Sequence, residues 1–176
     1  MMMEKTVPSP LPNPPPQAGE GTNDRYANLS FPLADEAETL ALAQRLAARL
    51  TPGLVVYLHG DLGAGKTTLV RGVLNALGHS GRVKSPTYTL LEQYSAGGLE
   101  LRHFDLYRLN DEEEWESAGF RDEFDGQNVF FIEWPEKAQG LIPAADMEID
   151  LHIAGEGRIA TLRAKTKTGR ECLERL

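Results

Sequence analysis

The fold of this chain is decided by one stretch, Leu54-Val55-Val56-Tyr57-Leu58-His59-Gly60-Asp61-Leu62-Gly63-Ala64-Gly65-Lys66-Thr67-Thr68. Its first five residues form an uninterrupted apolar run with β-branched and aromatic members, which is typical of a strand buried on both faces of a sheet. From Lys66 to Leu77 the apolar residues recur at helical spacing, and Gly78 marks the expected end of the helix. The glycine-rich segment therefore connects a buried strand directly to an amphipathic helix.

That segment matches the pattern G-x-x-x-x-G-K-[ST] at every fixed position. Glycines permit backbone angles that turn N–H groups toward an anion, and the following helix adds the positive end of its dipole. We expect Lys66 to contact the β- and γ-phosphates of a nucleotide and the Thr67 hydroxyl to bind Mg²⁺. The predicted nucleotide-binding residues are Asp61, Leu62, Gly63, Ala64, Gly65, Lys66, Thr67 and Thr68.

The nucleotide is predicted to be ATP. Guanine specificity usually depends on the pattern [NT]-K-x-D, and the nearest resemblance to it, Thr166-Lys167-Thr168-Gly169, lacks the aspartate.

A phosphate loop needs a second acid near the metal, usually at the end of a neighbouring buried strand. Glu133 follows the apolar run Val129–Ile132 and is predicted to bind Mg²⁺, directly or through water, or to orient the attacking water. Its alternative is an ordinary carboxylate in solvent. Asp105 is the other candidate acid, although it equally suits an ion pair with Arg108 or the cap of a turn.

Three further positions carry two interpretations each. His103 is favoured as a packed or hydrogen-bonded residue over a metal ligand, since no second His or Cys lies at metal-binding spacing. Ser85-Pro86-Thr87 is either a loop whose hydroxyls sense the γ-phosphate or a rigid connection into a strand. Trp134 either stacks on a base or fills the core.

The remaining pattern predicts a single domain over residues 28–165, with a flexible Pro-rich tail at 1–27 and a C-terminal tail at 166–176. We expect a short strand at Asn28–Phe31, ended by Pro32, and then a helix from Asp35 to Leu50.

Two β-hairpins are predicted, one from Thr87–Tyr94 and Leu99–Tyr107 and one from Met147–Ile153 and Arg158–Ala164, with an acidic helix at Asp111–Ser117. The fold class is α/β: a P-loop NTPase-like three-layer sandwich with parallel strands at the phosphate loop and added antiparallel hairpins.

Composition limits the possible functions. The 176 residues carry a net charge of −8, which argues against direct binding to DNA or RNA. The single cysteine, Cys172, has no partner for a disulfide and no ligand cluster for zinc. Neither an apolar run of membrane-spanning length nor a signal-peptide core is present, so we expect a cytoplasmic protein without a membrane partner.

The order of Gly60–Thr68, Ser85–Tyr88, His103–Leu109 and Ile132–Lys137 closely resembles the bacterial TsaE (YjeE) family over about Ser30–Leu162. The resemblance implies a small accessory ATPase required for threonylcarbamoyladenosine (t6A) in tRNAs that read codons beginning with A. It also implies binding to a complex of the TsaD and TsaB proteins, with tRNA involved only indirectly.

Carried over by motif, Thr67 and Glu133 would be the magnesium residues, Lys66 the phosphate clamp and Asp105 a carboxylate needed for hydrolysis. Ser85–Thr87 would be the switch-like loop. The resemblance does not extend to the two ends of the chain.

Two other classes of function remain open from the residues. One is a small-molecule P-loop kinase, although no Arg-rich lid is evident; the other is a module that binds ATP as a structural ligand. The motifs offer no internal arginine finger, so weak hydrolysis by the isolated chain is expected.

Overall fold

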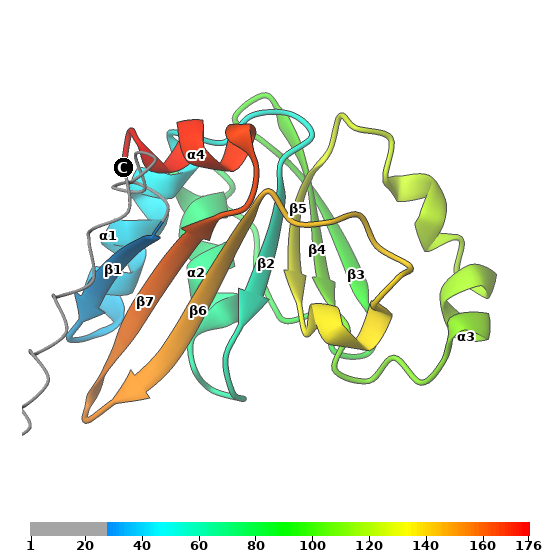
Figure 1. The fold of residues 1–176 in the computed structure, drawn as a ribbon, viewed down its shortest axis with the longest axis horizontal. Coiled ribbons are helices and arrows are strands. Elements are labelled where there is room, and N and C mark those ends of the chain that lie inside the picture. The colour runs from blue at the N-terminus through cyan, green and yellow to red at the C-terminus, as the bar shows by residue number, and fades with distance from the viewer. Residues whose placement is uncertain (1–27) are drawn as a thin grey trace, which may run out of the picture.

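The computed structural model describes residues 28–176; the predicted flexible tail at 1–27 lies outside them. Seven strands form one sheet in the order β1-β7-β6-β2-β5-β4-β3 (Figure 1). The strands are β1 (Asn28–Leu33), β2 (Val55–His59), β3 (Leu91–Ala96), β4 (Leu99–Asp105), β5 (Val129–Glu133), β6 (Met147–Ala154) and β7 (Gly157–Ala164).

The centre of the sheet is parallel and its flanks are antiparallel. Strand β2 pairs in parallel with both β5 and β6, and β4 pairs in parallel with β5. The two predicted hairpins are the antiparallel pairs β3–β4 and β6–β7, and β1 adds to the edge of β7. The first hairpin begins later than predicted, because Leu90 has a positive φ of 61° and residues before it form a turn.

The α-helices are α1 (Glu36–Ala47), α2 (Lys66–Ala76), α3 (Glu112–Ser117) and α4 (Lys167–Leu173). Two 3₁₀ helices flank β5 in the chain: η2 (Phe120–Glu123) precedes it and η3 (Pro135–Ala138) follows it. Asp35 and Asp111 cap α1 and α3 by accepting hydrogen bonds from the N–H groups of Glu38 and Glu114.

Alternate residues of the central strands form two separate hydrophobic cores. Val56, Leu58 and Phe131 pack with apolar residues of α1, α2 and α4 on one face. Val55 and Phe130 pack on the other face with residues from α3, η2 and η3. The predicted three-layer α/β sandwich is therefore confirmed.

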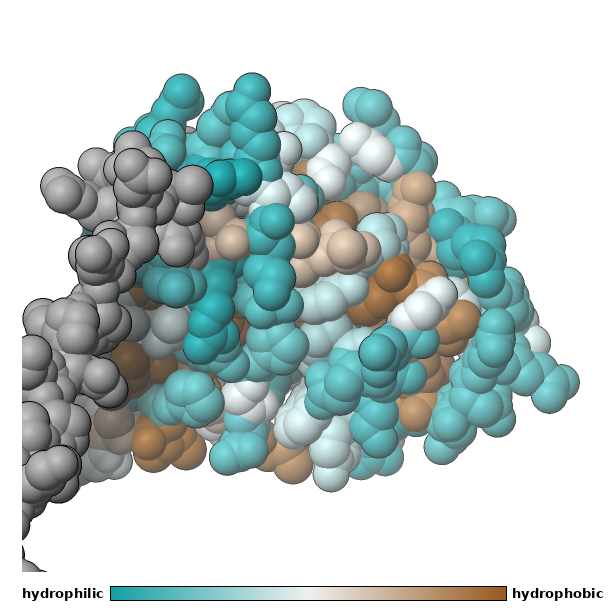
Figure 2. Space-filling model, viewed as in Figure 1, coloured by the Kyte–Doolittle hydropathy of each residue, from teal (hydrophilic) through white to brown (hydrophobic). Residues whose placement is uncertain are grey.

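The second helical layer covers only the half of the sheet built by β2, β5 and β4. Over β6 and β7 the same face carries partly exposed charged residues, among them Glu148, Asp150 and Arg163. The surface above these two strands is accordingly mostly hydrophilic (Figure 2).

Two sequence predictions at the ends of the domain are wrong. Pro32 does not end the first strand but pairs with Ile159 inside it, which is possible because β1 is an edge strand. Residues 166–176 do not form a tail, since Lys167–Leu173 is helix α4 and Cys172 and Leu173 are buried in the first core. Thr166 caps this helix, and at Gly169 an added Cβ would lie 1.9 Å from the Asp146 carbonyl oxygen.

Candidate functional site

The phosphate loop lies at the carboxyl end of β2 and leads into α2, as the sequence predicts. Gly60, Gly63 and Gly65 have φ angles of 134°, 79° and 108°, a region that side chains disfavour. An added Cβ at Gly60 would lie 2.4 Å from the Leu151 carbonyl oxygen, so the loop also packs closely on β6. The N-terminus of an eleven-residue helix faces this loop, which suits an anion.

Lys66 is not in solvent but only 4% exposed. Its Nζ donates hydrogen bonds to the carbonyl oxygens of Gly60 and Asp61, the second at 3.0 Å, and lies 4.5 Å from the centre of the Trp134 ring. Burial lowers the pKa of Lys66, while the carboxylates of Glu133 and Asp105 oppose that shift. The ammonium group is thus held inside the loop, beside two carboxylates.

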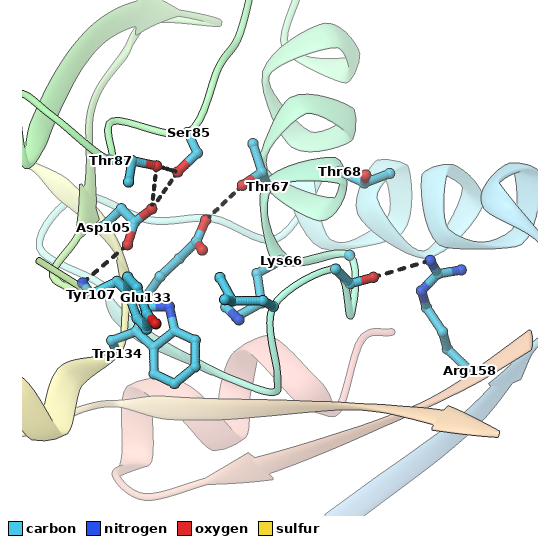
Figure 3. A pocket seen from close by; sticks show the side chains of 13 residues that line it. Lys66, Thr67, Thr68, Ser85, Thr87, Asp105, Tyr107, Glu133, Trp134 and Arg158 are labelled. Carbon is cyan, nitrogen blue, oxygen red and sulfur yellow. Dashed lines mark hydrogen bonds between the residues drawn. The ribbon is translucent and has the colours of Figure 1, made fainter.

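Glu133 and Thr67 meet although they are 66 positions apart in the chain. The Thr67 hydroxyl, in the first turn of α2, donates a 3.0 Å hydrogen bond to Glu133 Oε1 at the end of β5 (Figure 3). Because β2 and β5 are parallel neighbours, their carboxyl ends lie at the same edge of the sheet. Glu133 is 4% exposed, so the alternative of an ordinary solvent carboxylate is wrong.

Asp105 lies beside Glu133, since the two residues are partners in the parallel register of β4 and β5. Its carboxylate accepts hydrogen bonds from the hydroxyls of Ser85 and Thr87, the second at 3.1 Å (Figure 3). It also accepts a 3.1 Å bond from the Tyr107 N–H, so it caps a turn as well. Among the described residues, Asp105 forms no ion pair with Arg108, whose Cζ lies instead 4.6 Å from the centre of the Tyr88 ring.

Trp134 has an αL conformation with φ of 58°, which is rare for a bulky residue. Its ring is half-buried at the margin of the second core and lies 5.0 Å from the Tyr107 ring centre. It borders the cavity above the phosphate loop. Trp134 is therefore both a packing residue and part of the wall of the site.

The structure adds Arg158, which sequence reasoning did not single out. Its Nε donates a 2.6 Å hydrogen bond to the Ala64 carbonyl oxygen of the phosphate loop. Its Nη2 donates a longer bond of 3.4 Å to the Gly63 carbonyl oxygen (Figure 3). Arg158 is the second residue of β7. Because β6 runs parallel to β2, the turn between β6 and β7 lies at the same edge of the sheet as the phosphate loop. Only the sheet order brings them together; an isolated Arg after a turn carries no signal.

A cavity of about 270 Å³ opens over the loop. Most predicted site residues border it, but Asp61 and Ala64 do not; Ala64 is instead buried in the first core. The bordering residues are Leu62, Gly63, Gly65, Lys66, Thr67, Thr68, Ser85, Thr87, Asp105, Tyr107, Glu133, Trp134 and Arg158.

Within residues 28–176, no group of three or more His, Cys, Asp and Glu is placed to hold a metal ion by itself. In the same residues no helix is both long and apolar enough to span a membrane.

A parallel-centred sheet with this strand–loop–helix unit and an acid at the end of the adjacent strand defines a P-loop NTPase-like protein. Comparison with known proteins narrows the class. The family model of the threonylcarbamoyl adenosine biosynthesis protein TsaE matches residues 33–160. The chain belongs to the TsaE family.

Individual TsaE proteins are similar to this chain in sequence, and a solved structure is similar to it in fold. The tRNA threonylcarbamoyladenosine biosynthesis protein TsaE of Haemophilus influenzae is 50% identical over 120 residues, covering 68% of this chain and 76% of that protein. The Bacillus subtilis protein of the same name is 39% identical over 128 residues, covering 73% and 80%. The crystal structure of Bacillus subtilis YdiB superimposes with a TM-score of 0.69 at 31% identity, covering 84% of this chain and 92% of that one.

Proposed function

We propose that this chain binds ATP with Mg²⁺ and hydrolyses ATP as an accessory protein in t6A formation on tRNAs that read codons beginning with A. The proposal is carried by the 3.0 Å hydrogen bond between Thr67 and Glu133. That bond joins the hydroxyl of the phosphate loop to a buried acid on the neighbouring strand. A magnesium ion bound to a nucleotide requires those two groups at that place.

The residues present fit both ligands. The loop glycines, the N-terminus of α2 and Lys66 together supply the positive field that a triphosphate needs. Mg²⁺ takes only one or two carboxylates in such sites and completes its shell with water and phosphate oxygens, so a larger acidic cluster is not required. Thr67 and Glu133 would hold the ion, and when bound it neutralises the charge that develops on the phosphates.

The chain's own groups divide the remaining tasks. Lys66 would place a charge at the phosphates; burial lowers its pKa, and the carboxylates of Glu133 and Asp105 oppose that shift. Glu133 is available to orient an attacking water. Asp105 fixes Ser85 and Thr87 at the cavity, where their hydroxyls are positioned to respond to the γ-phosphate.

A protein partner is expected at the mouth of this cavity. Leu62 and Tyr107 border it yet are 65% and 40% exposed, and Tyr88 nearby is 85% exposed. Exposed apolar side chains that gather around one cavity mark a candidate contact site for another protein. We propose that the complex of TsaD and TsaB covers them in the cytoplasm. The net charge of −8 fits a protein that acts on tRNA only through those partners.

The test is ATP turnover with Mg²⁺, measured for the chain alone and with TsaD and TsaB added. We expect weak activity alone, stimulation by the partners, and loss of the stimulated activity in Glu133→Ala. Glu113→Ala is the matched control, because Glu113 is exposed on α3 and does not border the cavity. Stimulation that persists in Glu133→Ala would refute the role of Glu133. Transfer of phosphate to a small acceptor, without stimulation, would instead favour a kinase.

A further inference from the structure

His103 is a buried polar residue whose side chain makes one hydrogen bond within residues 28–176, to the proposed magnesium ligand Glu133. It lies on β4, is 1% exposed, and its Nε2 lies 2.9 Å from Glu133 Oε1. His103 pairs in register with Phe131 on β5. Because Glu133 lies two residues after Phe131, the side chains of His103 and Glu133 are on the same face of the sheet. The same Glu133 oxygen accepts the hydrogen bond of the Thr67 hydroxyl.

The direction of the His103 bond follows from its partners. An ionised carboxylate only accepts, so Nε2 must carry the proton and donate it. The other ring nitrogen, Nδ1, is buried and has no hydrogen-bond partner in the described part of the chain. A proton on Nδ1 would have no acceptor there. The surroundings therefore assign a hydrogen to Nε2, the nitrogen that faces the carboxylate.

Two donors on one oxygen restrict how the carboxylate can rotate. With Oε1 held by His103 and Thr67, Glu133 presents its other oxygen, Oε2, which makes no hydrogen bond within residues 28–176. Glu133 borders the cavity. The arrangement matches the way partners outside the coordination sphere fix the orientation of metal ligands.

We propose that His103 is a positioning residue that orients Glu133 for Mg²⁺ at the phosphate loop, a role that rests on the proposed function. A merely structural His103 would be replaceable by an apolar side chain of similar size. If His103 instead positions Glu133, its replacement must keep a hydrogen-bond donor that reaches Glu133 Oε1. His103→Leu removes the donor and keeps much of the volume, whereas His103→Gln keeps an N–H donor at a similar reach.

The experiment measures binding of a fluorescent ATP analogue as Mg²⁺ is titrated, and in EDTA, for the wild type and both variants. For His103→Leu we expect the Mg²⁺ concentration that gives half of the maximal increase in analogue binding to rise about 10- to 100-fold. Affinity in EDTA should stay within about twofold, since the Mg²⁺-free contacts do not pass through Glu133. His103→Gln should recover most of the Mg²⁺ response. His152→Leu, at a side chain that is 66% exposed, controls for loss of an imidazole elsewhere.

Nitrogen-15 NMR of the histidine side chains provides a readout without nucleotide. We expect His103 in the wild type to have its hydrogen on Nε2, and its signals to shift in Glu133→Gln. A folded His103→Leu variant with the wild-type Mg²⁺ response would overturn the proposal. If that variant does not fold, a hydrogen on Nδ1 in the wild type, or no recovery in a folded His103→Gln, would overturn it. A wild type whose nucleotide binding ignores Mg²⁺ would refute the proposed function instead.

Discussion

Asp105→Asn is expected to loosen the loop that contains Ser85 and Thr87 without unfolding the domain. The Asp105 carboxylate accepts from both hydroxyls and from the Tyr107 N–H. Asparagine removes the negative charge, keeps one acceptor oxygen and replaces the other with a donor, so the bonds from Ser85 and Thr87 are weakened or lost. A hydrogen bond to a charged group contributes about 1.5–3 kcal/mol. We therefore expect the loop to open about 2 kcal/mol more easily.

Hydrogen exchange of the Leu90 amide measures this opening directly. That N–H donates a 2.7 Å bond to the Pro86 carbonyl oxygen and closes the turn that holds the loop. Since 1.4 kcal/mol corresponds to a factor of ten, we expect its protection to fall about 30-fold. Amides of α1, which pack in the first core, should lose much less protection.

Asp146→Asn is the matched control. Asp146 also accepts two hydrogen bonds, from the Val55 N–H at 3.0 Å and the Thr166 hydroxyl at 2.6 Å, but it lies away from the cavity. Its replacement should leave the Leu90 amide no more affected than the core amides. Unchanged Leu90 protection in Asp105→Asn would refute the reasoning, because the carboxylate would then not hold the loop.

Three further predictions concern packing, the loop and the C-terminal helix. In Gly72→Ala the new Cβ would lie 2.6 Å from Ala43 Cβ, and overpacking of about 1–3 kcal/mol should outweigh a helix gain of about 1 kcal/mol. Urea unfolding should show a less stable variant that a second change, Ala43→Gly, partly rescues; a more stable Gly72→Ala would contradict this. Arg158→Ala loses the bond to the phosphate loop and a nearby charge, so nucleotide Kd should rise about fivefold, with Arg158→Lys intermediate. Burial raises the pKa of Cys172 from 9.0 to about 11, so roughly 100-fold less of this thiol is ionised at pH 8. We therefore expect the native chain to be alkylated slowly and the urea-unfolded chain rapidly. Equal alkylation rates in the native and unfolded chain would mean that α4 is not docked.

The sequence determined the local chemistry of this protein. An apolar run, a fixed glycine pattern and an amphipathic helix are consecutive, so Val55 to Ala76 could be interpreted without knowledge of distant contacts. The two hairpins were equally local, because each joins neighbouring strands through a short glycine turn. The end of β1 and the helix α4 were missed because both depend on packing: Pro32 is tolerated only at a sheet edge, and α4 is short and weakly patterned.

The roles of the acids depend on contacts that form in the folded sheet. Spacing left Asp105 between two interpretations, and the parallel register of β4 and β5 placed it beside Glu133 and the loop hydroxyls. Register likewise turned His103 toward Glu133, and sheet order brought Arg158 to the phosphate loop. The His103–Glu133 contact joins residues 30 positions apart, and the Arg158–Ala64 contact joins residues 94 positions apart. Contacts of this kind form only when the strands have the right order and register. Hydrophobic patterning specifies which residues are buried, but it does not specify which strands become neighbours.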